Sequence, residues 1–104
     1  MEYVIAFVTT PTVEEAKRIA ESLVERKLAA CVNVIPQVDS YYWWNGKIES
    51  DQEAKLVIKT KSELMEELIE SVRKLHSYEI CEVTSVPIVG GNADYLKWID
   101  ENVK

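Results

Sequence analysis

The chain has 104 residues, of which 47% are hydrophobic and 29% are charged, and its formal net charge at neutral pH is −6. This length is enough for one domain with its own core, and the composition excludes a disordered chain. An acidic surface repels phosphates, so the charge excludes nucleic acid as the main partner. We therefore expect a single globular domain over residues 1–104.

The sequence also predicts where the protein resides. No stretch approaches the roughly 20 apolar residues that span a bilayer, so we expect no membrane partner. The apolar start, residues 1–8, has only the length of a strand and is followed by Pro11, so we expect no signal peptide. Cys31 and Cys81 are too few for a disulfide framework. We expect both to be thiols in a cytoplasmic protein.

The first third of the chain predicts a strand followed by a helix. Residues 3–8 form a continuous apolar, β-branched run, which is typical of a strand buried on both faces. Thr12 and Glu15 have the spacing of a capping box, in which each side chain satisfies a free backbone donor. The helix should end near residues 26–27. Its inner face carries apolar residues at helical spacing, namely Val13, Ala16, Ile19, Ala20, Leu23 and Val24.

The middle of the chain predicts a long β-hairpin. Residues 28–38 form a second strand, and the chain stays extended and aromatic as far as residue 44. Asn45-Gly46 is the strongest short-range hairpin signal, because both residues tolerate the positive φ of a type I′ turn. Residues 47–60 then return as a third strand.

The last third predicts a helix, a strand and a terminal helix. Ser62 can cap the first of these helices, and residues 80–89 form a strand in which Pro87 marks an edge or an end. Asn92 caps the terminal helix. The inner faces are predicted to carry Leu64, Met65, Leu68, Ile69, Val72 and Leu75 in the first helix, and Tyr95, Leu96, Trp98 and Ile99 in the second.

This order of elements, β-α-β-β-α-β with an appended C-terminal helix, predicts an α+β, ferredoxin-like fold. Right-handed crossovers leave few other topologies. We expect a four-stranded antiparallel sheet in the order fourth, first, third, second strand. Both main helices should lie on one face of the sheet.

The central hairpin is too long for its own domain. Each arm has about a dozen residues and, at ~3.3 Å per residue, reaches roughly 40 Å, whereas the radius of gyration of such a domain is about 13 Å. Tyr41, Tyr42, Trp43 and Trp44 place large rings on both faces near the turn. We predict that these rings bury against another subunit rather than against the chain's own sheet. Pairing of opposite sheet edges then closes a cyclic oligomer.

The run from residue 76 to residue 82, His-Ser-Tyr-Glu-Ile-Cys-Glu, contains the only histidine and lies where a helix gives way to a strand. Imidazole, thiolate and carboxylate are the common ligands of transition metals, and imidazole with thiolate suits copper or zinc. In the alternative interpretation, His76 only stabilises the helix end, where an N–H can satisfy a terminal carbonyl. Both interpretations stay open. The candidate metal ligands are His76, Glu79, Cys81 and Glu82.

Enzyme signatures are absent from the sequence. It contains no nucleophile elbow, no phosphate loop and no Cys-x-x-Cys pair. We therefore expect neither an enzyme nor an organic cofactor.

Several segments together resemble the CutA family, the divalent-cation tolerance proteins. The matching segments span nearly the whole chain in the right order. They are Leu28 to Asn33, then Ser40, Tyr42, Trp44 and Gly46 to Ile48, then Glu53, Lys59 and Thr60, then His76, Tyr78 and Glu79, and finally Tyr95, Leu96, Trp98 and Ile99.

The resemblance implies a homotrimer of ferredoxin-like subunits that binds divalent metals, copper especially, and takes part in metal-ion tolerance. It also implies a likeness to the trimers of PII-type signalling proteins. The alternative function is therefore a trimeric signalling or scaffold module that binds a small ligand or a partner protein at clefts between subunits.

The chain departs from the family's pattern at two places. The family's histidine motif usually reads His-Pro-Tyr-Glu-x-Pro-Glu, but Ser77 and Cys81 stand at the proline positions. Loss of the prolines frees the backbone and restores two N–H donors. Some relatives also carry a cysteine near the end of the first strand, where this chain has Thr9, a poor metal ligand.

Overall fold

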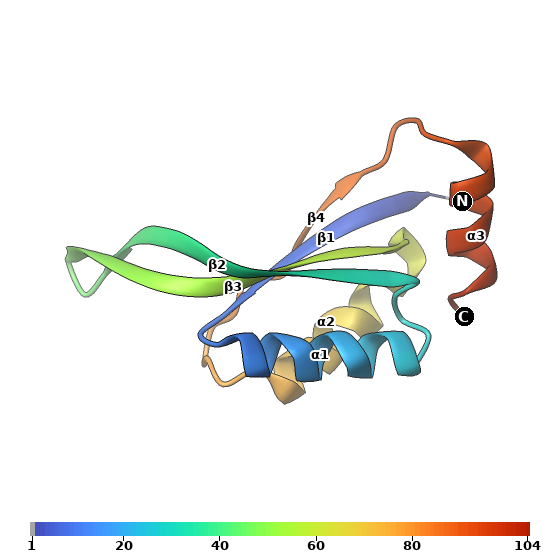
Figure 1. Ribbon diagram of the computed structural model, residues 1–104. Coiled ribbons are helices and arrows are strands. Elements are labelled where there is room, and N and C mark those ends of the chain that lie inside the picture. Colours follow the sequence, from blue (N-terminus) through green and yellow to red (C-terminus); the bar gives the residue numbers. More distant parts are fainter. Residues whose placement is uncertain (1) are drawn as a thin grey trace.

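A twisted antiparallel sheet, covered on one face by two helices, forms the body of the chain (Figure 1). The computed structural model describes residues 2–104, and within them the sheet has four strands in the order β2-β3-β1-β4. The strands are β1 (Tyr3–Thr10), β2 (Cys31–Trp44), β3 (Lys47–Lys61) and β4 (Thr84–Pro87). The helices are α1 (Val13–Glu25), α2 (Met65–Leu75), which follows the short 3-10 helix η1 (Ser62–Leu64), and α3 (Ala93–Glu101). The predicted fold class and strand order are confirmed.

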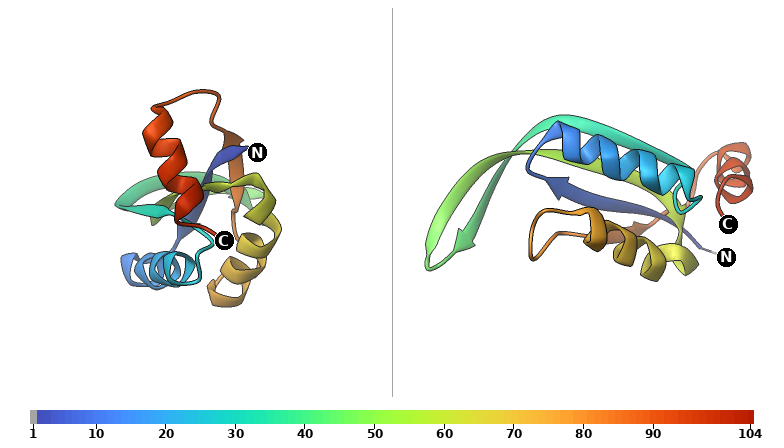
Figure 2. Two further views of the ribbon diagram at one scale, coloured as in Figure 1. Left: turned by 90° about the vertical axis from the view of Figure 1, so that its right-hand side faces the viewer. Right: turned by 90° about the horizontal axis from the view of Figure 1, so that it is seen from below.

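The core lies between the sheet and the helices α1 and α2, which Figure 2 shows on the same side of the sheet. In β1 the even-numbered residues point into this core, and Ala6 and Val8 are fully buried. The odd-numbered residues, such as Ile5 and Phe7, are only half-buried. The prediction that this strand is buried on both faces was therefore wrong, because both main helices cover the same face. The other fully buried large side chains of the core are Ile19, Leu23, Leu28, Leu56, Ile58, Leu68 and Val72.

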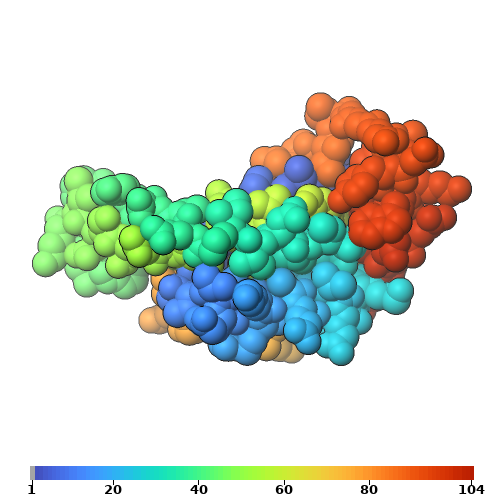
Figure 3. All heavy atoms as spheres, viewed as in Figure 1, coloured from blue at the N-terminus to red at the C-terminus, as the bar shows by residue number. Residues whose placement is uncertain are grey.

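The hairpin of β2 and β3 extends well beyond the body of the chain. β1 pairs with β3 only as far as Thr10 and Ala54, so the rest of the hairpin has no third strand beside it. Asn45 and Gly46 form the predicted turn, with φ of 49° and 79°. The molecule measures 45 × 25 × 23 Å, and the space-filling view in Figure 3 shows the hairpin as a projecting lobe.

The hairpin is bent as well as long. The pairing of β2 with β3 shifts register between Ile35 and Val38, across Pro36, which has no N–H to donate to the ladder. In the right-hand view of Figure 2, the hairpin curls so that its concave side faces the loop between α2 and β4. This curvature creates the cleft described below.

The last strand is shorter than predicted. Residues 80–83 are not in a strand, and β4 pairs with β1 only from Val4 to Phe7. Continuing this register would bring Glu82 opposite Thr9. The carbonyl oxygen of Thr9 instead lies 2.7 Å from Nε2 of His76, so the histidine ring occupies the place of the next ladder contact.

Other details of the predicted elements also differ. β2 begins at Cys31 rather than at residue 28, because the N–H groups of Leu28 and Ala29 bond to the carbonyl of Leu23 and close the end of α1. Ser62 makes no side-chain cap, since it lies in η1 and its N–H bonds to the carbonyl of Glu2.

Four apolar residues predicted to face inward are partly exposed. The rings of Tyr95 and Trp98 stack on each other at a centroid distance of 5.5 Å. The exposed fractions are 44% for Val24, 42% for Leu75, 41% for Tyr95 and 39% for Trp98.

None of the helices in residues 2–104 has the length and hydrophobicity of a membrane-spanning helix.

Candidate functional site

His76 caps the C-terminal end of α2, and its side chain is completely buried. The backbone N–H of Tyr78 lies 3.0 Å from Nδ1 and donates to it. Nδ1 is therefore an acceptor, which places the ring hydrogen on Nε2, where it is donated to the carbonyl of Thr9 at 2.7 Å. His76 thus joins the end of α2 to the end of β1, whereas the helix-end interpretation placed its N–H on a terminal carbonyl of the helix itself.

Glu15 is a buried partner of this joint that the sequence analysis did not identify. The predicted cap at Thr12 forms, because its Oγ1 accepts from the N–H of Glu15 at 3.1 Å. The reciprocal half of the capping box does not form. Glu15 Oε2 instead accepts from the N–H of Ser77 at 3.0 Å and lies 3.3 Å from Nδ1 of His76. A proline at residue 77 has no N–H, so serine makes this bond possible.

The other predicted metal ligands lie in different surroundings. Cys81 is a free thiol, is half-buried and packs against the core. It also lines a small hollow of about 200 Å³ together with Glu79 and the basic residues Arg73 and Lys74. Glu82 is exposed, and its Oε2 accepts from the hydroxyl of Thr84 at 3.0 Å.

These four residues do not form one ligand set within the chain. Across residues 2–104, no group of three or more His, Cys, Asp or Glu side chains is arranged to hold a metal ion. His76 binds a metal only if Nδ1 releases the N–H of Tyr78 or Nε2 releases the carbonyl of Thr9. The metal site therefore stays a prediction. Its set of ligands would have to be completed by residues of an additional chain.

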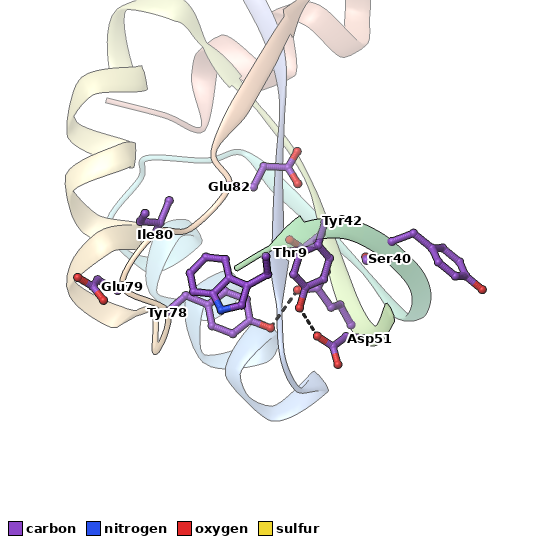
Figure 4. Close-up of a pocket in the computed structure, with 11 residues that line it drawn as sticks. Thr9, Ser40, Tyr42, Asp51, Tyr78, Glu79, Ile80 and Glu82 are labelled. Carbon is purple, nitrogen blue, oxygen red and sulfur yellow. Dashed lines mark hydrogen bonds between the residues drawn. The ribbon is translucent and has the colours of Figure 1, made fainter. Parts of the chain in front are cut away.

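A larger cleft of about 690 Å³ lies between the concave side of the hairpin and the α2–β4 loop (Figure 4). The hairpin and the loop form its two walls, and Thr9 lies at the end of β1 between them. The side chains that line it are mainly aromatic and acidic. The lining residues are Thr9, Ser40, Tyr41, Tyr42, Trp44, Asp51, Glu53, Tyr78, Glu79, Ile80 and Glu82.

Two tyrosine hydroxyls in this cleft donate hydrogen bonds to carboxylates that line it. The hydroxyl of Tyr42 donates to Asp51 within the hairpin, and the hydroxyl of Tyr78 donates across the cleft to Glu53 at 3.1 Å. Figure 4 shows the hydroxyl of Tyr42 beside Asp51. The hydrogen bond to Asp51 is the main cause that raises the pKa of Tyr42 to about 12. For Tyr78, burial and then the bond to Glu53 raise the pKa to about 12.

These raised pKa values predict a visible pH dependence. Folding favours the neutral phenols of Tyr42 and Tyr78, so the stability that their hydrogen bonds give is fully present below about pH 10. It is lost as pH rises toward 12, where the folded protein also loses these protons. We expect ultraviolet absorbance to show Tyr42 and Tyr78 titrating near pH 12. Asp51→Asn should return the pKa of Tyr42 toward its ordinary value, whereas Glu53→Gln should lower the pKa of Tyr78 only in part, because burial is its main cause. Titration of all tyrosines of the wild type near pH 10 would contradict the hydrogen bonds of Tyr42 and Tyr78 to their carboxylates.

The comparison with known proteins decides the family. Residues 4–102 match the family described as CutA1 divalent ion tolerance protein. The chain belongs to this family. It is 57% identical over 98 residues to Protein CutA homolog of Xenopus laevis, and this match covers 94% of the chain but 65% of the relative. Several eukaryotic CutA relatives are thus matched over less than two thirds of their own length.

An archaeal relative and a plant structure match almost from end to end. The divalent-cation tolerance protein CutA of Archaeoglobus fulgidus is 45% identical over 98 residues, with 94% of this chain and 95% of the relative covered. The crystal structure of CutA1 from Oryza sativa superposes with a TM-score of 0.98 at 42% identity and covers 100% of this chain and 95% of that one. The ferredoxin-like CutA fold predicted from the sequence is therefore confirmed.

Proposed function

We propose that the protein is a homotrimer that binds divalent metal, copper in particular, and takes part in metal-ion tolerance. The observation that carries this proposal is the α2–β4 loop. In sequence it carries a half-buried free thiol, Cys81, two residues after the exposed Glu79 and one residue before the exposed Glu82, ahead of the edge strand β4. Thiolate and carboxylate with a nearby imidazole favour copper or zinc over harder ions. Membership of the divalent ion tolerance family supports a role that involves divalent ions in general.

The exposed hairpin supports the trimer. Its aromatic tip is poorly covered within one chain, since Tyr41 and Trp43 are 72% and 71% exposed and Trp44 is 55% exposed. Such a surface is typical of a contact between subunits. The strands β2 and β4 are the two edges of the sheet, so head-to-tail pairing closes a ring.

The proposed ring of subunits also explains why the set of metal ligands is incomplete within one chain. Because β4 is an edge strand, a neighbouring subunit that pairs with it lies close to Cys81 and Glu82. In the proposed site these two residues and His76, once released from its present hydrogen bonds, act together with donors from that neighbour. A cytoplasmic location belongs to the proposal, and the two free thiols, Cys31 and Cys81, suit a reducing compartment.

A metal titration tests this function. We expect Cu(II) to bind more tightly than Zn(II) or Ni(II), in line with the general order of affinities. Replacing one ligand, in Cys81→Ser or Glu82→Gln, should weaken copper binding by about tenfold or more. Glu66→Gln, which changes an exposed carboxylate at the far end of α2, is the matched control and should leave the affinity unchanged. Equal affinity in all variants would remove these residues from the site.

A second function is favoured by the cleft. Its volume of about 690 Å³ exceeds what a metal ion needs and falls in the range of small-molecule sites. A trimeric module that binds a small ligand is therefore the alternative to metal binding.

A further inference from the structure

The cleft between the hairpin and the α2–β4 loop carries charge of one sign. Asp51 and Glu53 lie on the hairpin wall, and Glu79 and Glu82 lie on the loop wall. The described lining residues include no lysine, arginine or histidine. Asp51 and Glu53 each accept one tyrosine hydroxyl, but a carboxylate offers about four acceptor positions. The cleft is therefore complementary to a ligand with positive charge.

The carboxylates are too widely spread for a bare ion. No three of the acidic side chains in residues 2–104 converge on one point. Their division between two walls matches a ligand that carries positive groups at separate positions. Such a ligand contacts both walls at once.

The aromatic rings define what lies between those charges. Tyr42 and Trp44 of the hairpin and Tyr78 of the loop all line the cleft, so aromatic rings lie on both walls. Aromatic faces attract ammonium groups and pack well against methylene groups. The ligand that fits these walls has ammonium groups joined by an apolar chain.

We propose that this cleft binds a linear aliphatic polyamine. The inference rests on the small-ligand alternative of the proposed function and names its ligand class. The ammonium groups contact Asp51 and Glu53 at one end and Glu82 at the other, and the methylene chain lies against Tyr42, Trp44 and Tyr78.

The proposal is tested by isothermal titration calorimetry with spermidine. The buffer contains a chelator that removes metal ions. We expect a Kd below about 1 mM, which rises with added salt because the charges are partly exposed. Butylamine has one ammonium group and should bind about tenfold more weakly, because it cannot reach both walls.

Two cleft variants and two matched controls locate the site. Glu53→Gln keeps an acceptor for the hydroxyl of Tyr78 but removes the charge, and Trp44→Leu removes a ring; each should weaken spermidine binding by about fivefold. Glu21→Gln on α1 and Trp98→Leu on α3 lie outside both the cleft and the hairpin and should stay within about twofold. Light scattering on Glu53→Gln and Trp44→Leu establishes that both variants keep the oligomeric state of the wild type, which Trp44→Leu must do because Trp44 also belongs to the predicted subunit contact.

Three results would overturn the proposal: no spermidine binding at millimolar concentration, equal binding of butylamine, or equal losses in the cleft variants and their controls. These results leave the copper titration and the oligomeric mass untouched. Failure of the polyamine site is therefore distinguishable from failure of the metal-binding trimer.

Discussion

Replacing His76 with alanine is expected to lower the free energy of unfolding by about 3 kcal/mol, an effect at the upper end of what single substitutions produce. The ring is completely buried and bonded at both nitrogens. Without it, the carbonyl of Thr9 loses its donor and the N–H of Tyr78 loses its acceptor. A cavity also remains between α1, α2 and β1.

Chemical denaturation of the two proteins at equal chain concentration measures this loss, since unfolding of an oligomer depends on concentration. Glu79→Ala, three residues away and exposed, is the control and should change the free energy by no more than about 0.5 kcal/mol. A similarly small change for His76→Ala would show that the ring does not hold the joint together.

The substitution Trp43→Asp is expected to convert the proposed trimer into single chains. Trp43 pairs across the hairpin with Ile48, and these side chains are 71% and 64% exposed in one chain. In the proposed interface a carboxylate here is buried without a partner. We expect the association constant to fall by about 100-fold or more, as for a central residue of an interface.

Light scattering over a range of concentrations measures this dissociation. Val24→Asp is the matched control, because Val24 is an exposed apolar residue on α1, at 44% exposure, and lies outside the hairpin. A wild type of one chain, or a trimer unaffected by Trp43→Asp, would contradict the interface.

The parts of the fold that depend on local patterns could be predicted from the sequence. Asn45-Gly46 predicts the hairpin turn and Thr12 predicts the start of α1, because both patterns act within a few residues. The strand order follows from the handedness of the two crossovers. The length of β4 could not be predicted, because it depends on a contact between His76 and Thr9, which are far apart in the chain.

In the candidate site, too, features set by local sequence patterns could be predicted, and features set by contacts distant in sequence could not. The histidine run was recognisable from its residue types, and its place at the end of α2 was predicted. Glu15 was missed, since the capping-box pattern gave its carboxylate another partner. A signal was present in its spacing, because Glu15 lies four residues before Ile19, on the buried side of α1. The cleft could not be predicted, because it results from the bend of the hairpin toward the α2–β4 loop.

Ser77 and Cys81 give the family's histidine motif a different chemistry in this chain. The N–H of Ser77 binds Glu15 and fixes the joint between α1 and α2, a bond that proline cannot make. Cys81 adds a thiol one residue before Glu82. We infer that metal affinity depends on this thiol, which is why Cys81→Ser is the decisive ligand variant.

Native mass spectrometry of the protein equilibrated with Cu(II) tests the metal-binding homotrimer most directly, because it reports chain number and bound metal together. The predicted result is a complex of three chains that retains copper, and loss of the copper but not of the trimer in Cys81→Ser. A single chain, or a trimer from which copper is absent, would contradict the account.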